Sequence, residues 1–302
     1  MHTNTDSKNN LTKIVLFSFL FLSTSASAKI NIGITLHPYY SYVKNIVADK
    51  ANVIPLIEAG FNPHAYKLSP ADLNRLQSMD AIVVNGIGHD EFAIDVLKKL
   101  KLKDLNIIYS NESVPLISKP GGKKHNPHTF VSIDAAIRQI YTIARQLAKV
   151  DPDNGKFYIK NAWIYAKKLR NIKNQASIKL RDLDLSNIRI ASTHNAYGYL
   201  LQEFGMTVSA VVEPAHGVSP SAAQLQKTIN KIRDVNVHIL FTELNMANQY
   251  VKVIEKETQS RLFHFSHMTY GDYREELVIE DMSHNLDTLV SALTYAAGRI
   301  TL

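Results

Sequence analysis

The sequence predicts an α/β fold in which two parallel-sheet lobes are joined by a single long backbone helix. Short runs rich in β-branched residues alternate with amphipathic stretches in both halves of the chain, which is the pattern of βαβ units. The 302 residues suffice for two domains of about 150 residues. One uninterrupted helical pattern separates the halves. The predicted parts are a signal peptide (1–28), an N-terminal lobe (29–150), the linking helix (151–182) and a C-terminal lobe (183–302).

The elements of each lobe follow from local signals. In the first half, strands are predicted over 30–36, 53–57, 81–85 and 106–109, and helices over 40–49, 70–77 and 91–99. In the second half, strands are predicted over 189–192, 207–212, 237–242 and 261–265, and helices over 195–204, 221–234, 247–258 and 285–299. The linking helix begins after Asp151-Pro152-Asp153, and its apolar residues recur at the i, i+3, i+4, i+7 spacing of an amphipathic helix. A helix of about 27 residues would be about 40 Å long, enough to run along both lobes.

Composition restricts the function classes. Lys and Arg exceed Asp and Glu by 34 to 27 but form no basic run, so we expect no nucleic-acid partner. We also expect a monomer. The chain has no Cys, which excludes a disulfide scaffold, a cysteine nucleophile and a thioether lipid anchor. Any transition-metal site must therefore use His and carboxylate ligands.

The N-terminus has the features of a cleaved secretory signal. Lys8 and Lys13 precede an apolar run over 14–22, and small residues end at Ala26-Ser27-Ala28. Such a short run cannot cross a hydrocarbon core about 30 Å thick. We expect cleavage after Ala28 and a periplasmic protein that is not lipid-anchored.

Three histidines occupy similar positions, in loops next to predicted strands or helices. His64 and His128 each end an Asn-Pro-His motif, and His194 follows the predicted strand over 189–192. Proline fixes φ near −65° and restricts the residue before it, so each Asn-Pro-His turn is stiff. Ligands of open α/β sheets bind at the carboxyl ends of strands, where such loops gather. A lone loop histidine is usually solvated, but this repeated pattern favours a shared metal site.

The motifs resemble those of the metal-binding solute receptors of ABC importers, the ZnuA/TroA-like family. The resemblance covers nearly the whole mature chain and rests on the Asn-Pro-His turns, Leu36-His37-Pro38-Tyr39, Asn85-Gly86-Ile87-Gly88, His194-Asn195-Ala196-Tyr197-Gly198-Tyr199 and Phe241-Thr242-Glu243. It implies a metal held in the interlobe cleft by His64, His128 and His194. It also implies delivery of that metal to an ABC-type permease in the inner membrane.

The fourth ligand is where this chain departs from the family. Members usually supply an Asp that opens an Asp-Pro turn, whereas residues 262–268 contain no such pair. The candidates are His267, His264, Glu243 and Asp272. His267 is preferred because it lies past the end of the predicted strand over 261–265. In the resembling family Glu243 corresponds to a residue that orients a ligand imidazole.

The other polar residues near these motifs have ordinary interpretations. His125 and His216 are expected to be solvated. His89 and Glu91 follow the Asn-Gly-Ile-Gly turn and are expected to begin a surface helix.

The ligand types favour Zn(II) as the transported ion. Imidazole suits zinc, whereas carboxylates and water suit Mn(II), so Mn(II) or Fe(II) is the second choice. The alternatives are a periplasmic metallochaperone and an exported zinc hydrolase that uses Glu243 as its base. The chain has no His-Glu-x-x-His motif, so a non-enzymatic protein is favoured.

Overall fold

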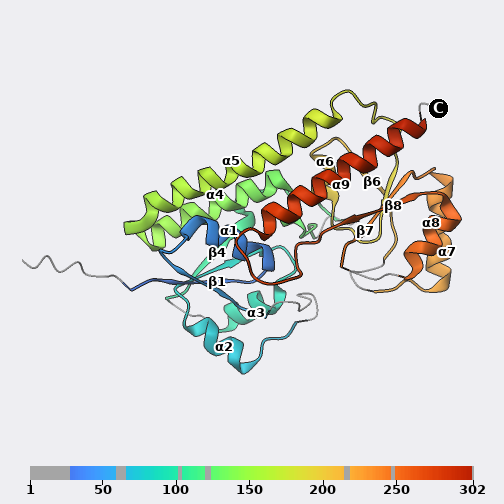
Figure 1. Ribbon diagram of the computed structural model, residues 1–302. Helices are drawn as coiled ribbons and strands as arrows, with labels where there is room; N and C mark the ends of the chain where they lie inside the picture. Colours follow the sequence, from blue (N-terminus) through green and yellow to red (C-terminus); the bar gives the residue numbers. More distant parts are fainter. Residues whose placement is uncertain are drawn as a thin grey trace, which may run out of the picture.

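Two four-stranded parallel sheets form the framework of the protein (Figure 1). The computed structural model describes residues 28–58, 66–100, 104–119, 124–213, 218–245 and 249–300. The strand order is β2-β1-β3-β4 in the first sheet and β6-β5-β7-β8 in the second, so both halves repeat one topology. The predicted α/β class with two parallel-sheet lobes is confirmed.

The bounds of the elements agree closely with the sequence prediction. The first sheet and its helices comprise β1 (Asn31–Ile34), α1 (His37–Val47), β2 (Asn52–Pro55), α2 (Pro70–Gln77), β3 (Ala81–Val84), α3 (Glu91–Leu100) and β4 (Asn106–Tyr109). The second comprises β5 (Ile190–Ser192), α6 (Gly198–Gln202), β6 (Val208–Val211), α7 (Ala222–Asp234), β7 (Ile239–Glu243), α8 (Gln249–Thr258), β8 (Arg261–Phe265) and α9 (Leu277–Ile300). The short 3-10 helices are η2 (Ser110–Ser113), η3 (Thr129–Val131) and η4 (Pro152–Asn154). The bounds of α2, β4 and β8 are those predicted.

Two helices differ most from the prediction, and α6 is also shorter than the predicted helix over 195–204. The helix α4 (Ile133–Val150) was not predicted, although Ser132 caps it by accepting the backbone N–H of Ala135. Its apolar face packs against α5 and the first sheet. The helix α9 begins at Leu277, well before the predicted start at residue 285. This extra stretch includes Val278 and Met282, which are buried in the main core, so tertiary packing stabilises it.

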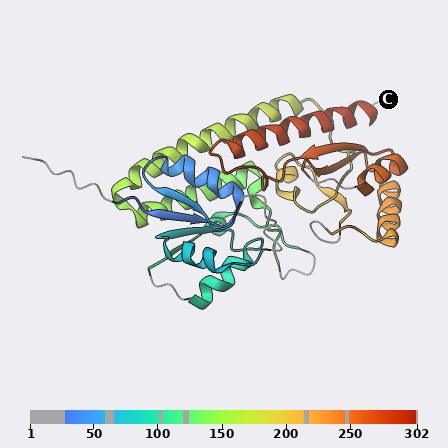
Figure 2. The ribbon, with the colours of Figure 1, turned by 60° about the horizontal axis from the view of Figure 1, so that its bottom comes forward.

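The linking helix α5 (Gly155–Leu180) runs beside α9 along both sheets (Figures 1 and 2). Its 26 residues span about 39 Å at 1.5 Å per residue. One buried apolar cluster includes Ile32 of β1, Leu169 of α5, Phe241 of β7 and Leu289 of α9, so the core is continuous across both halves. The division of the chain at residues 150 and 182 stays a prediction.

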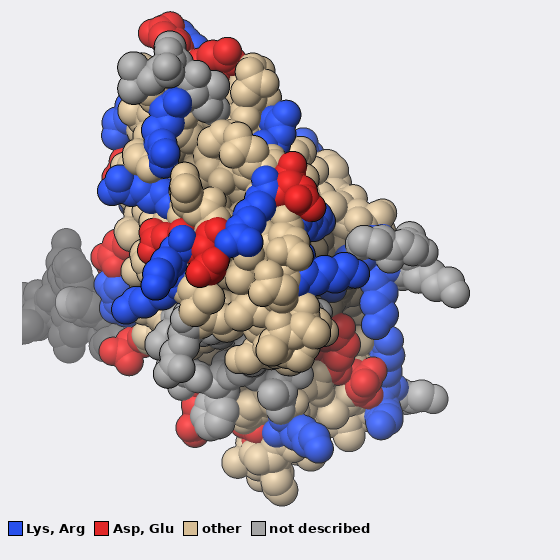
Figure 3. Space-filling view, turned by 90° about the vertical axis from the view of Figure 1, so that its right-hand side faces the viewer, with Lys and Arg blue, Asp and Glu red and all other residues tan. Residues whose placement is uncertain are grey.

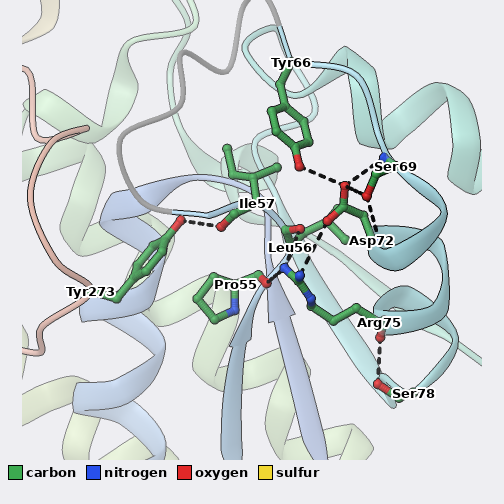
Figure 4. Close-up of polar contacts among 9 residues, drawn as sticks. All are labelled: Pro55, Leu56, Ile57, Tyr66, Ser69, Asp72, Arg75, Ser78 and Tyr273. Atoms are coloured by element: carbon green, nitrogen blue, oxygen red, sulfur yellow. Dashed lines mark hydrogen bonds and ion pairs between the residues drawn. The ribbon is translucent and has the colours of Figure 1, made fainter.

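A second connection between the halves follows β8. The segment 271–275, which we call the strap, lies against α1 and the end of β2. Nε2 of His37 donates to the carbonyl of Gly271 at 2.9 Å, and the rings of His37 and Tyr273 stack with centroids 4.4 Å apart. The hydroxyl of Tyr273 donates to the carbonyl of Ile57 at 2.9 Å (Figure 4). The strap therefore ties the chain just after β8 to the first lobe.

The surface carries charges of both signs. On the face shown in Figure 3, basic side chains lie next to acidic ones. Exposed pairs such as Arg233 with Glu257, 2.7 Å apart, contribute to this mixture. Within the described residues, no helix has both the length and the apolar character needed to cross a membrane.

Candidate metal centre

Four histidines and one glutamate meet where strands of both sheets end. His194 and His267 follow β5 and β8, Glu243 is the last residue of β7, His89 lies between β3 and α3, and His128 lies between β4 and α4. The carboxyl ends of parallel strands point to one edge of a sheet, so the topology gathers these residues. All five residues are buried, with exposed fractions between 1% and 6%.

Asn126 fixes the orientation of the His128 ring. Its Oδ1 accepts the backbone N–H of His128 at 3.0 Å and lies 2.7 Å from Nδ1 of the same residue. An amide oxygen can only accept, so Nδ1 carries the proton and the lone pair is on Nε2, which is buried. Nδ2 of Asn126 donates to the carbonyl of Asn195 at 2.9 Å, which links the Asn-Pro-His turn to the second lobe.

Glu243 orients His194 in the same way. Its Oε1 lies 2.9 Å from Nδ1 of His194, and both side chains are buried. The carboxylate accepts from Nδ1, so Nε2 of His194 is left to bind a metal. Register places the two residues together: β5 and β7 pair in parallel with Ser192 opposite Phe241, and His194 and Glu243 each lie two residues beyond this pair.

His267 is held by a loop anchored to α9. Asn285 accepts the backbone N–H of Ser266 at 2.7 Å and donates to its carbonyl at 2.9 Å. Nδ1 of His267 lies 3.1 Å from Oγ1 of Thr269, and its other ring nitrogen, Nε2, is buried. Met268 has φ of 61°, and this left-handed turn redirects the chain into the strap.

The rings are close enough to share an ion. Ring centroids of His128 lie 4.5 Å from those of His194 and 5.2 Å from those of His267, and the last two are 5.3 Å apart. Ligand atoms of His194, Glu243 and His267 all lie within 4.8 Å of one another. Since Zn–N bonds are about 2.0–2.1 Å, ligands of one ion lie at most about 4.2 Å apart. Small adjustments of these side chains would bring the three ligand atoms within bonding distance of one ion.

His89 was not predicted as part of the cluster, and the expected surface position is wrong. Only 1% of His89 is exposed, and its ring contacts that of His128 edge to face with centroids 4.4 Å apart. The cause is Asp90, which accepts the backbone N–H groups of Asn85 and Gly86 and the hydroxyl of Thr35 and so folds the turn inward. Burial raises the pKa of Asp90 to about 6.

A close contact holds this turn against the Asn-Pro-His turn. Gly88 has φ of 128°, and a Cβ there would lie 2.9 Å from Cβ of Pro127, so only glycine fits. Nδ2 of Asn85 donates to the carbonyls of Gly88 and Pro127 at 2.7 and 3.0 Å. The two glycines before His89, at the end of a central strand, are the sequence signal that could have indicated a tightly packed turn at this position.

The remaining predicted residues lie apart from the cluster or outside the described residues. His264 and Asp272 are exposed, and the structure does not bring either into the cluster. His125 is half-buried next to the Asn-Pro-His turn. His64 and His216 lie outside the described residues, as does the predicted signal peptide up to residue 27.

The residues that flank the His64 segment make defined contacts (Figure 4). On one side, the carbonyl of Ile57 accepts from Tyr273 of the strap. On the other, the hydroxyl of Tyr66 donates to Asp72 at 2.8 Å, and Asp72 also accepts from Ser69 at the start of α2. The residues before the His64 segment therefore contact the strap, and those after it contact the start of α2.

Solved structures of similar proteins share this fold. The SBP FpvC from Pseudomonas aeruginosa in complex with Mn²⁺ is 47% identical, with a TM-score of 0.84, over 89% of this chain and 100% of that one. A structure of FpvC with Ni²⁺ gives the same identity and TM-score. Among sequence relatives, the high-affinity zinc uptake system protein ZnuA of Bacillus subtilis is 25% identical over 90% of this chain and 91% of its own.

The names of other relatives correct one prediction. The metal ABC transporter substrate-binding lipoprotein FimA of Streptococcus parasanguinis is 25% identical over 90% of this chain and 92% of its own. Three further streptococcal relatives are also named lipoproteins. The expectation of a protein that is not lipid-anchored is therefore wrong on this comparison, whereas a position outside the cytoplasm agrees with it. The expectation rested on the absence of Cys, which bears only on a thioether anchor.

Family membership follows from a match along most of the chain. The sequence model of the zinc-uptake complex component A, periplasmic (ZnuA), matches residues 32–292. That span includes both sheets, the linking helix and all five residues of the cluster. The chain belongs to the ZnuA family of zinc-uptake complex periplasmic components.

Proposed function

We propose that this protein is a metal receptor that binds a divalent transition ion, with Zn(II) as the first choice, and delivers it to an ABC importer permease. The observation that carries the proposal is the buried meeting of His128, His194 and His267 at the strand ends of both lobes. Three imidazoles whose second nitrogen is already hydrogen-bonded form a preorganised, nitrogen-rich site of the kind that suits zinc.

The proposed ligand set keeps the four histidines of the sequence interpretation, His64, His128, His194 and His267. His64 is included because it ends an Asn-Pro-His motif and because the residues on either side of its segment make defined hydrogen bonds. Glu243 supports His194, and its carboxylate lies within 4.8 Å of ligand atoms of His194 and His267. Its presence makes Mn(II) or Fe(II) the second choice, since carboxylate oxygen suits these ions.

A transport role fits the geometry better than catalysis. A zinc hydrolase needs a general base beside the metal, and Glu243 is instead engaged as the acceptor for Nδ1 of His194. We therefore assign no catalytic residue. We expect a monomer that docks on a membrane permease and binds no nucleic acid, in keeping with the mixed charges of Figure 3.

The test is titration of chelator-stripped protein with Zn(II) and Mn(II). An ion that binds only the folded state raises its stability by RT ln(1 + [L]/Kd), about 4 kcal/mol at a thousandfold excess over Kd. We expect a zinc-dependent rise in melting temperature and one ion per chain by elemental analysis.

Single substitutions identify the ligands. His128→Ala, His194→Ala and His267→Ala should each weaken Zn(II) binding at least tenfold, which is about 1.4 kcal/mol. His264→Ala is the matched control, because His264 lies three residues before His267 but is exposed, and it should bind like wild type. A melting temperature unchanged at saturating Zn(II) would reject the proposed function.

A further inference from the structure

The cluster contains two overlapping groups of potential ligands. Ligand atoms of His194, Glu243 and His267 form one group, and those of His89, His128 and His267 form another, each within 4.8 Å. The second group consists of nitrogen donors only. Its ring centroids are 4.4 Å apart for His89 and His128, and 6.0 Å apart for His89 and His267. None of the motifs used to interpret the sequence places a ligand at residue 89.

We propose that His89 is a metal ligand and that, with His128 and His267, it forms a second, all-histidine position for the same ion. This inference rests on the proposed function, since it adds a position to the same receptor site. The two positions share His267 and are bridged by the contact between His128 and His194.

One ion, rather than two, follows from the hydrogen bonds of the shared rings. Nδ1 of His128 donates to Asn126, and Nδ1 of His267 lies against Thr269 Oγ1, so each ring offers only Nε2. One imidazole nitrogen has one lone pair and binds one ion. Because His267 belongs to both groups, the two positions cannot be filled together with complete ligand sets.

The backbone conformation of His89 is strained. Its φ of 76° lies in the left-handed region, which a residue with a Cβ adopts only when surrounding contacts impose it. Asp90 and the contact of Gly88 with Pro127 impose it here. A right-handed conformation at residue 89 would turn the imidazole away from His128.

The two positions differ in the ions they suit. The all-nitrogen position favours metals late in the divalent series, such as Ni(II), Co(II) and Zn(II). The position with Glu243 also suits Mn(II), because a carboxylate has two oxygens and only Oε1 accepts from Nδ1 of His194. His89 thus broadens the receptor toward nitrogen-preferring ions.

The test compares Ni(II), Zn(II) and Mn(II) affinities of wild type and His89 variants by chelator competition. His89→Asn is the main variant, because Asn adopts positive φ readily and preserves the turn, and His89→Gly is the second. His264→Asn is the matched control. We expect Ni(II) and Zn(II) affinity of both His89 variants to fall at least tenfold and Mn(II) affinity to change less than threefold. The absorption spectrum of the Co(II)-loaded protein should change, with one ion bound per chain.

Ni(II) affinity and a Co(II) spectrum like those of wild type in both His89 variants would overturn the inference, and so would two ions per chain. If His128→Ala and His194→Ala lose binding while the His89 variants do not, the inference fails and the proposed function stands. If wild type binds none of these ions, the proposed function itself fails. Anomalous diffraction from nickel-loaded wild-type crystals decides without a variant, because the ion either lies within bonding distance of a His89 ring nitrogen or does not.

Discussion

Asn126→Ala tests whether the proposed site depends on the orientation of one ring. The Asn126 side chain makes two hydrogen bonds to His128, one to its backbone N–H and one to Nδ1, and a third to the carbonyl of Asn195 in the second lobe. Both Asn126 and His128 are buried. The substitution removes all three bonds without inserting new bulk.

The expected effects on stability and on binding have separate sources. Each lost hydrogen bond costs about 0.5–1.5 kcal/mol, and a buried donor left unsatisfied costs about 1–3 kcal/mol. We therefore expect the free energy of unfolding to fall by about 2–4 kcal/mol. Loss of the partner that orients a ligand imidazole typically costs 10–100-fold in metal affinity, or about 1.4–2.8 kcal/mol.

Urea denaturation of chelator-stripped protein gives the stability, and chelator competition gives the Zn(II) affinity. Asn106→Ala is the control, because the exposed side chain of Asn106 also makes a hydrogen bond, to the carbonyl of Asp80, but stands at the opposite end of the sheet. It should lower stability by at most about 1 kcal/mol and leave binding unchanged. If Asn126→Ala lowers stability but binds Zn(II) within twofold of wild type, the argument that Asn126 orients His128 is refuted.

Three further predictions concern packing, the strap and pH. Gly88→Ala should lower the free energy of unfolding by about 2–4 kcal/mol in urea, because it adds a clash to the strain of a positive φ. Gly205→Ala, with φ of 72° and no atom near its added Cβ, should cost only about 1–2 kcal/mol, and equal losses would contradict the clash. Tyr273→Phe removes the hydrogen bond to Ile57, so it should lower the free energy of unfolding by about 1 kcal/mol and leave Zn(II) affinity within twofold of wild type. An unchanged urea midpoint would contradict a stabilising role of the strap in the fold. Burial lowers the pKa of His37 below 6.5, so the unfolded state takes up the proton first and stability falls as pH drops through 6.5. Between pH 7.5 and 5.5, the free energy of unfolding measured in urea should fall less for His37→Phe than for wild type. Equal falls would exclude His37 as a source of the pH dependence.

The sequence by itself predicted the elements whose signals are local. The capped start at Ser69 and Pro70 gave the bounds of α2, and the apolar spacing after Asp151 gave the linking helix. Position relative to a strand end separated His267, which is buried, from His264, which is exposed. These features depend on residues a few positions apart, so the chain records them without its fold. The helix α4 carried a comparable amphipathic pattern and was nevertheless not assigned.

Only the tertiary structure decided which distant side chains meet. His89 joins His128 because a carboxylate folds its turn inward and a glycine lets that turn contact a proline from another loop. The strap reaches α1 across more than two hundred residues of sequence, through contacts that no local period encodes. The early start of α9 likewise depends on burial against α5 and α1. Periodicity and capping act over one or two turns of chain, whereas the distance between two side chains in the metal centre depends on how both sheets and their helices pack together.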